Sequence, residues 1–186
     1  MPAIALLLPL FATAPVAGPE CAAGGDPIQN LICRDATLRA REIEVQRLYR
    51  SAEHVLPAPQ RAAQRTRHNA WLGERAACAP DPDARNCVAD AQGRRIVELK
   101  LALGELPVFA SATYLCKGHE ATPLTAAYFH SDPPAVLLRF QNQQAIAFAA
   151  PSGSGARYSA EGVEIWEHQG VARFTWQGEE MECPKR

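Results

Sequence analysis

The fold of the C-terminal half is decided by a stretch that runs Ser154-Gly155-Ala156-Arg157-Tyr158-Ser159-Ala160-Glu161-Gly162-Val163-Glu164-Ile165-Trp166-Glu167-His168. It begins as a glycine-rich loop and continues into a short apolar strand. Gly153 and Gly155 stand on either side of Ser154, so the backbone there is able to adopt positive φ or to approach another surface closely. Tyr158 and Trp166 add two rigid amphipathic side chains. The combination predicts a presented binding loop.

Outward from this loop, the hydrophobic pattern of the C-terminal half has a period of two. Segments rich in aromatic and β-branched residues alternate with breaks such as Asp-Pro-Pro, Gln-Asn and Gln-Gly, which indicates an antiparallel meander of about seven to eight strands. Closure into a small β-barrel would remove its exposed edges. The segments expected as strands are Tyr114–Lys117, Thr122–Phe129, Ala135–Phe140, Gln143–Ala149, Val163–His168, Ala172–Trp176 and Glu179–Cys183.

The N-terminal half has the period of an amphipathic helix instead. After Asp35, a good N-cap residue, apolar residues recur at helical spacing as far as Pro57. Two further helices are expected, from about Pro59 to Ala77 and from Val88 to Leu103, separated by Pro80 and Pro82. We therefore predict an α+β protein of two domains, in which a disulfide-stapled helical hairpin or three-helix unit precedes the barrel.

Length and charge agree with two small domains. A chain of 186 residues has room for them, and we place a helical domain at 19–103, a linker at 104–112 and the barrel at 113–186. Residues 20–103 carry 13 Lys/Arg against 11 Asp/Glu, and residues 104–186 carry 6 against 9. A slightly acidic second half favours a cationic partner. No basic patch with interleaved aromatics is present, so no nucleic-acid partner is expected.

The first 18 residues are predicted to be a secretory signal peptide, because an apolar run from Ile4 to Phe11 is followed by small residues. That run is too short to span a bilayer, and no other segment comes close, so no transmembrane helix is expected in the mature protein. The residues before Cys21 are Gly18-Pro19-Glu20, unlike the small and apolar run before a lipid-modified cysteine. We expect a periplasmic or secreted protein that is not a lipoprotein.

Six cysteines in an exported chain predict three disulfides. Spacing favours Cys21–Cys33 and Cys78–Cys87, each closing a short loop, but cross-pairing of these four stays open because a bond depends on separation in space. Cys116 and Cys183 are alone in the second half, and Cys116–Cys183 would tie the first strand to the last. There is no Cys-x-x-Cys pair and the histidines are scattered, so neither a metal site nor a cofactor is expected.

The sequence shows no constellation of catalytic residues. Ser154 lies in Gly-Ser-Gly, whereas a nucleophile elbow needs glycines two places away on either side and a strand-to-helix turn. His168 has no evident acid to orient it as a base. We therefore expect that the protein is not an enzyme.

The pattern Ser-Gly-x-x-Tyr, then Gly-Val-x-Ile-Trp and a basic residue two places on, resembles the MliC/PliC family of bacterial inhibitors of c-type lysozyme. The resemblance covers about 112–186 and includes Tyr114-Leu115-Cys116 and Cys183. It implies a small barrel whose partner is a c-type lysozyme. The family's basic residue is normally Lys, and His168 stands there in this chain. The lysozyme-binding residues that the resemblance implies are Ser154, Gly155, Tyr158, Trp166 and His168.

This resemblance suggests how inhibition would work. A c-type lysozyme acts with two carboxylates that flank a groove, and a loop that inserts a hydroxyl and a cationic or donor side chain between them would block it. Ser154 is then the hydroxyl and His168 the donor, while Tyr158 and Trp166 shape the loop. The role of Arg157 is left open. The alternative is a cell-envelope binding module with no lysozyme inhibition. This alternative stays open because His168 stands where the family normally has Lys.

The helical half resembles the N-terminal domain of LprI-type lysozyme inhibitors. Tyr49, Trp71 and Arg75 are among the matching residues, and we interpret them as a packed aromatic pair with a charged anchor, because aromatics at helical spacing usually lie in a core. The other matching features are Cys21, Cys33, Leu38, Glu42, Val45, Leu72, Cys78 and Cys87.

Overall fold

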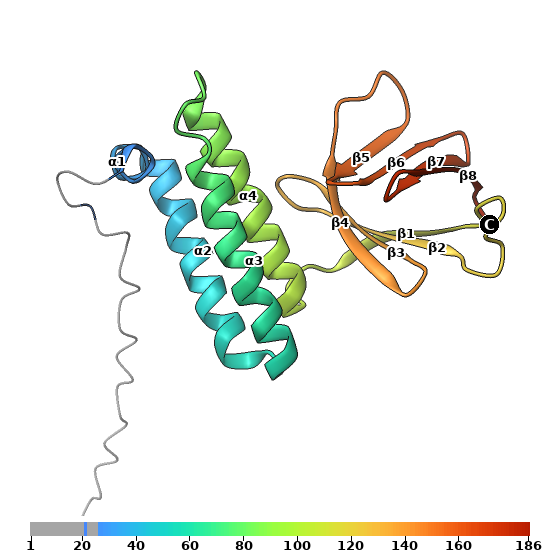
Figure 1. Ribbon diagram of the computed structural model, residues 1–186, viewed down its shortest axis with the longest axis horizontal. Helices are drawn as coiled ribbons and strands as arrows, with labels where there is room; N and C mark the ends of the chain where they lie inside the picture. Colours follow the sequence, from blue (N-terminus) through green and yellow to red (C-terminus); the bar gives the residue numbers. More distant parts are fainter. Residues whose placement is uncertain (1–20, 22–25) are drawn as a thin grey trace, which may run out of the picture.

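The chain folds into a helical half followed by a curled antiparallel sheet (Figure 1). This computed structural model describes Cys21 and residues 26–186, and the predicted signal peptide lies outside the described residues. The two-part α+β architecture predicted from the periodicity is confirmed. The helices are α1 (Pro27–Arg34), α2 (Ala36–Val55), α3 (Ala58–Ala76) and α4 (Ala84–Leu103).

Local sequence signals decide where these helices begin and end. The Asp26 carboxylate accepts hydrogen bonds from the first backbone N–H groups of α1, and Asp35 does the same for α2. Pro57 follows the end of α2 and precedes α3. Gly104, with φ +71°, terminates α4 in the left-handed conformation that glycine adopts without strain. The helices bury two apolar clusters. One is formed by Val45, Leu48, Ala52, Leu56, Trp71 and Leu99, and the other by Ile28, Ile32, Leu38, Cys78 and Val88.

A network of polar and aromatic side chains lies between α2, α3 and α4. Arg75 Nη1 donates to Glu42 Oε1 at 2.6 Å, and Gln92 Nε2 donates to Glu42 Oε2 at 2.9 Å. The Arg75 guanidinium lies 4.8 Å from the centroid of the Trp71 ring, while Tyr49 stacks on His68 at 3.9 Å between centroids. The predicted packed aromatics with a charged anchor are therefore confirmed.

The sheet has eight strands in chain order, each antiparallel to the next. β8 lies beside the segment that follows β1, where the Leu115 N–H donates to the Pro184 carbonyl at 2.9 Å and the Lys117 N–H to the Glu182 carbonyl at 3.0 Å. This contact curls the sheet into the predicted barrel-like form. The strands are β1 (Val108–Tyr114), β2 (Leu124–Phe129), β3 (Ala135–Phe140), β4 (Gln143–Ala149), β5 (Ala156–Ala160), β6 (Val163–His168), β7 (Val171–Trp176) and β8 (Glu179–Pro184).

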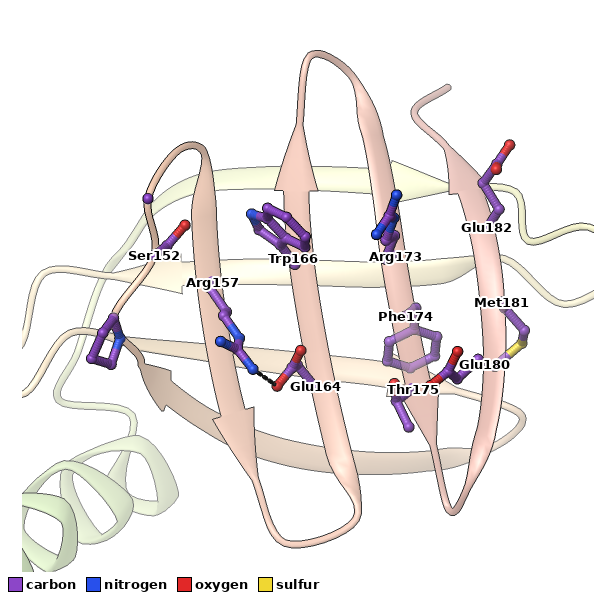
Figure 2. A pocket seen from close by; sticks show the side chains of 12 residues that line it. Ser152, Arg157, Glu164, Trp166, Arg173, Phe174, Thr175, Glu180, Met181 and Glu182 are labelled. Carbon is purple, nitrogen blue, oxygen red and sulfur yellow. Dashed lines mark hydrogen bonds and ion pairs between the residues drawn. The ribbon is translucent and has the colours of Figure 1, made fainter.

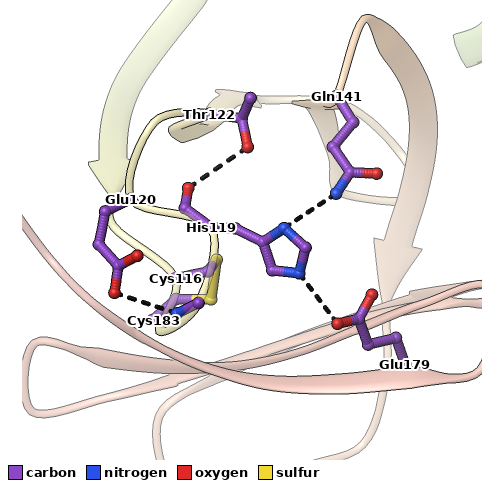
Figure 3. Close-up of a disulfide and its surroundings, with 8 residues drawn as sticks. Cys116, His119, Glu120, Thr122, Gln141, Glu179 and Cys183 are labelled. Atoms are coloured by element: carbon purple, nitrogen blue, oxygen red, sulfur yellow. Dashed lines mark hydrogen bonds and ion pairs between the residues drawn. A yellow bond between two sulfur atoms is a disulfide. The ribbon is translucent and has the colours of Figure 1, made fainter.

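All three predicted disulfides are present: Cys21–Cys33 and Cys78–Cys87, the pairs favoured by spacing, and Cys116–Cys183 in the sheet. Cross-pairing of the four N-terminal cysteines does not occur. Figure 3 shows the last of these beside His119. His119 Nε2 lies 2.9 Å from Glu179 Oε1 and Nδ1 lies 3.1 Å from Gln141 Nε2. The disulfide and this histidine together connect the segment after β1 to β8 and to the β3–β4 turn.

Two strands differ from the sequence-based expectations. β1 begins at Val108, inside the segment 104–112 that was expected to be a linker; its first four residues are exposed, so they show no alternation that sequence inspection would detect. β5 forms at Ala156–Ala160, where the loop was expected to continue. Its small residues have little intrinsic preference for a strand, and pairing with β6 decides their conformation.

The helical half packs directly on β3 and β4. Val97 of α4 forms one buried cluster with Ala135 and Phe148, and Arg41 Nη2 lies 3.3 Å from the Asp132 carboxylate. Gly93 of α4 faces Pro133, and a Cβ there would stand 3.1 Å from the proline Cδ. Within residues 26–186, no helix has the length and apolar character needed to cross a membrane.

Candidate functional site

The loop between β4 and β5 carries Ser154 and is held against β6 by its backbone. Gly155 has φ +69°, and a Cβ added there would overlap the backbone carbonyl oxygen of Glu167. No other residue type fits without a shift of the backbone, because both the left-handed conformation and the close approach favour glycine. The glycine therefore brings the loop into direct contact with β6.

A side chain of β6 fixes the same loop. The Trp166 indole Nε1–H donates to the Ser154 carbonyl at 2.9 Å. The Ser152 hydroxyl also donates to that carbonyl, and the Ser154 N–H donates to Ser152 Oγ at 3.3 Å. Ser154 itself is exposed. Its hydroxyl has no hydrogen-bond partner in the described part of the chain, so it is available to an external group.

The strand register sets a row of side chains on the outer face of the sheet. Arg157 of β5 lies opposite Trp166, Trp166 lies opposite Arg173 of β7, and Arg173 lies opposite Glu182 of β8. Figure 2 shows Trp166 between the two arginines. The Arg173 guanidinium is 5.4 Å from the centroid of the Trp166 ring, and Arg157 Nη2 donates to Glu164 Oε2 at 2.7 Å. These side chains line a shallow hollow of about 590 Å³.

His168 lies at the end of β6 on this same face. It is exposed and stands two residues beyond Trp166, opposite Val171. A Cβ at Gly155 would lie 3.3 Å from the His168 Cβ, which shows how close the loop and this histidine are. With Trp166 and Arg173, His168 lines a second hollow of about 280 Å³. The structure thus brings Ser154, Gly155, Trp166 and His168 together on the outer face of the sheet, near the end of β6.

Tyr158 faces the opposite side of the sheet. It pairs with Ile165, which is 1% exposed, and its ring packs in the barrel core 5.6 Å from that of Tyr128. Burial raises the pKa of the Tyr158 hydroxyl. Of the five predicted site residues, Tyr158 is therefore the one that the fold does not bring to the outer face.

Comparisons with known proteins show the family of this chain. Residues 114–182 match the model of the MliC family, described as membrane-bound lysozyme-inhibitor of c-type lysozyme. Over 179 residues the chain is 35% identical to Lipoprotein LprI of Mycobacterium tuberculosis (strain H37Rv) and to that of Mycobacterium bovis; the match covers 94% of this chain and 88% of each relative. The chain belongs to the LprI family. Its sheet is the part that corresponds to MliC.

One outer-face residue of this LprI-family chain was missed by sequence inspection. Arg173 had no assigned role, because only the pairing of β6 with β7 places it beside Trp166. In the described residues Arg173 forms no ion pair, whereas Arg157 is paired with Glu164. The Glu182 carboxylate opposite Arg173 accepts a hydrogen bond from Lys117, which is the main reason that its pKa is lowered.

The polar groups at this site of the LprI-family sheet indicate the kind of ligand that it suits. In the part of the chain that the structure describes, no group of three or more His, Cys, Asp or Glu side chains is placed to hold a metal ion. The groups available at the site are the Ser154 hydroxyl, the His168 imidazole and the Arg173 guanidinium, all held on a fixed backbone. Such a set is suited to binding carboxylates.

Proposed function

We propose that this chain inhibits a c-type lysozyme and that the Ser154 loop enters the active-site groove of the enzyme. The family match of residues 114–182 supports the class of partner. The observation that carries the loop assignment is the hydrogen bond from Trp166 Nε1 to the Ser154 carbonyl. It holds the loop in place while the hydroxyl stays exposed and has no partner among the residues that the structure describes.

The chemistry of the enzyme explains why such a hydroxyl is useful. A c-type lysozyme uses one protonated and one ionised carboxyl group on either side of its groove. A serine hydroxyl donates to the ionised group or accepts from the protonated one. Because Gly155 and Trp166 already fix the loop, binding loses little conformational entropy in ordering it.

The cationic part of the site is shared, on this proposal, by two residues. His168 is exposed next to the loop and stands where the family's lysine would be. Arg173 adds a permanent positive charge held over the Trp166 ring. Arg157 contributes less, because Glu164 already pairs with it. Tyr158 acts from inside the barrel by supporting β5.

The proposal extends to location and organisation. We propose an exported protein, periplasmic or secreted, with a signal peptide at 1–18, a helical domain at 19–103 and a barrel domain that includes all of β1 from Val108 onward. The three disulfides support an oxidising compartment. The Cys21–Cys33 disulfide supports a chain that carries no lipid on Cys21. Blocking a groove requires neither a cofactor nor a catalytic residue of the inhibitor.

The test compares two serine variants of the full chain in binding to a c-type lysozyme and in protection of cell walls from lysis. Ser154→Ala removes the loop hydroxyl, and Ser111→Ala removes an equally exposed hydroxyl on β1. We expect Ser154→Ala to lose about 1 to 3 kcal/mol of binding free energy, the range for a hydrogen bond to a charged group, with unchanged unfolding free energy. Ser111→Ala should bind like the wild type.

Two results would contradict the proposal at different levels. Equal affinity of Ser154→Ala and the wild type would remove the loop from the contact. If the folded wild type slowed no c-type lysozyme at all, the inhibitor function itself would be wrong, and the envelope-binding alternative would take its place.

A further inference from the structure

A hollow separate from the two beside the Ser154 loop lies between the two halves of the molecule. It has a volume of about 590 Å³ and is formed by α3 and α4 on one side and by β3 and β4 on the other. Figure 1 shows α4 as the helix nearest to the sheet. Contacts of Val97 and Leu101 with Phe148 and Ile146 join the two halves beside it. We call this hollow the interdomain groove.

The interdomain groove is lined by more positive than negative charge. Three arginines line it, Arg67, Arg95 and Arg139, against one carboxylate, Glu98. That carboxylate is shared, since Arg67 Nη2 lies 2.8 Å from one of its oxygens and Arg95 Nη1 lies 3.0 Å from the other. One further carboxylate, Glu74, pairs with Arg67 at 2.7 Å from outside the lining. The two carboxylates balance two of the three arginines, so one positive charge at the groove stays unbalanced.

The state of the individual arginines shows where this charge is available. The Arg95 side chain is 0% exposed, and its Nε has no hydrogen-bond partner among the described residues, so its charge is poorly shielded by water. Arg139 is exposed at the mouth of the groove, and in the described ranges it forms no ion pair. Arg139 is thus free to bind a ligand directly, while Arg67 and Arg95 add to the positive potential.

The remaining lining indicates the kind of anion. The volume of the interdomain groove lies in the range of small-molecule sites and far exceeds the volume of an inorganic ion. Three glutamines also line the groove, Gln60, Gln64 and Gln144. Gln64 Oε1 already accepts a hydrogen bond from Arg95 Nη2 at 3.0 Å, and the remaining amide donors and acceptors complement the N–H and C=O groups of a peptide. Between them lie aliphatic side chains of a size that suits alanine-like groups: Leu56, Ala63, Leu101, Ala102, Leu137 and Ile146.

We propose that the interdomain groove binds a short acidic peptide, with a carboxylate on the Arg139 guanidinium and the peptide backbone against the glutamine amides. Guanidinium and carboxylate pair in a planar, two-bond geometry, which makes arginine selective for this group. Because α3, α4, β3 and β4 all contribute, bound peptide holds the helical half and the sheet together. This binding is independent of lysozyme inhibition through the Ser154 loop.

The experiment titrates the full chain with two capped tetrapeptides, acetyl-Ala-Glu-Glu-Ala-amide and its neutral counterpart acetyl-Ala-Gln-Gln-Ala-amide, and follows backbone amide resonances. We expect only the acidic peptide to shift resonances of α3, α4, β3 and β4, the elements that line the groove. Arg139→Gln should weaken its binding about ten-fold, as for loss of one charged hydrogen-bond pair. Arg50→Gln makes the same charge change on an exposed face of α2 outside the groove and should leave binding unchanged.

Several outcomes overturn the proposal. Equal binding of the two peptides, shifts confined to other elements, or an equal loss in Arg139→Gln and Arg50→Gln would each do so. Displacement of the acidic peptide by an equal concentration of inorganic phosphate would show a site for anions in general. Lysozyme inhibition is measured on the same Arg139→Gln sample and should be unchanged, so failure here is distinguishable from failure of the inhibitor function.

Discussion

The helical half and the sheet use their polar side chains in opposite ways. In the helical half, Glu42 is 5% exposed and accepts hydrogen bonds from both Arg75 and Gln92, so its carboxylate is satisfied inside the fold, although Arg75 Nε and Gln92 Oε1 have no hydrogen-bond partner among the described residues. On the outer face of the sheet, Ser154 and His168 are exposed, and the hydroxyl of Ser154 has no partner in the described residues. Polar groups that satisfy one another stabilise a fold, and polar groups left unsatisfied at a rigid surface are available for binding.

The largest effect is expected where the helical network loses a partner. Glu42→Ala leaves Arg75 buried without its carboxylate, which should cost about 3 kcal/mol or more of unfolding free energy. Glu161→Ala removes an exposed carboxylate at the β5–β6 turn and should change the unfolding free energy by less than about 0.5 kcal/mol. Denaturant unfolding measures both. Similar losses in the two variants would end the contrast between the halves.

The next effect concerns the backbone of the loop, with two neighbouring glycines as a matched pair. Gly155→Ala forces a Cβ against the Glu167 carbonyl at positive φ, so the loop must move; affinity for lysozyme should fall by about 2 kcal/mol. Gly153→Ala adds a Cβ that meets nothing within 4 Å and should bind like the wild type. Calorimetric titration distinguishes them. Wild-type affinity in Gly155→Ala would mean that the loop conformation does not matter for inhibition.

Acid sensitivity should separate the helical half from the binding face. Burial between Tyr49 and Trp71 lowers the pKa of His68 to about 4. The unfolded chain binds this proton below about pH 6.5, whereas the folded chain does not until about pH 4, so the unfolding free energy declines as pH falls through this window. His68→Phe keeps an aromatic ring but removes the proton site. Its unfolding free energy should decline less between pH 7 and pH 5 than that of the wild type, and equal declines would contradict this role.

The smallest effect is expected at His168. A lysine ammonium carries a full positive charge and three N–H donors, and charge-assisted hydrogen bonds to a carboxylate are the stronger ones. His168→Lys should therefore tighten lysozyme binding by about 1 kcal/mol or less. Calorimetric titration of lysozyme with both proteins checks this. If the lysine variant binds no better than the wild type, Arg173 supplies the positive charge without help from His168.

Much of the fold was predictable because its signals are local. Asp35 and Pro57 bound α2, the period of two marked most strands, and the spacing of cysteines pointed to the observed disulfides. The adjacency of Ser154, Trp166 and His168 was predictable for the same reason, since all three lie within one loop and the strand pair that follows it. β5 was missed because its small residues carry no strand signal of their own.

Side-chain direction was not predictable, because it depends on register. The pairing of Arg157 with Trp166 puts both on the outer face, and a strand sends successive side chains to opposite sides, so Tyr158 turns into the core. The same pairing across β6 and β7 places Arg173 over the indole. Composition and spacing contain no information on that register.

The amino-acid sequence alone established the helical period of the N-terminal half, the period of two of the C-terminal half, the helix ends, the disulfide spacing and the Ser154 motif. All of these are properties of residues near one another in the chain. The tertiary structure decided which face each site residue occupies, how the Trp166 indole holds the loop, and how Arg67 and Arg139 come to line one groove. Those arrangements join residues far apart in sequence, and their energy comes from packing and pairing that exist only after the halves have folded.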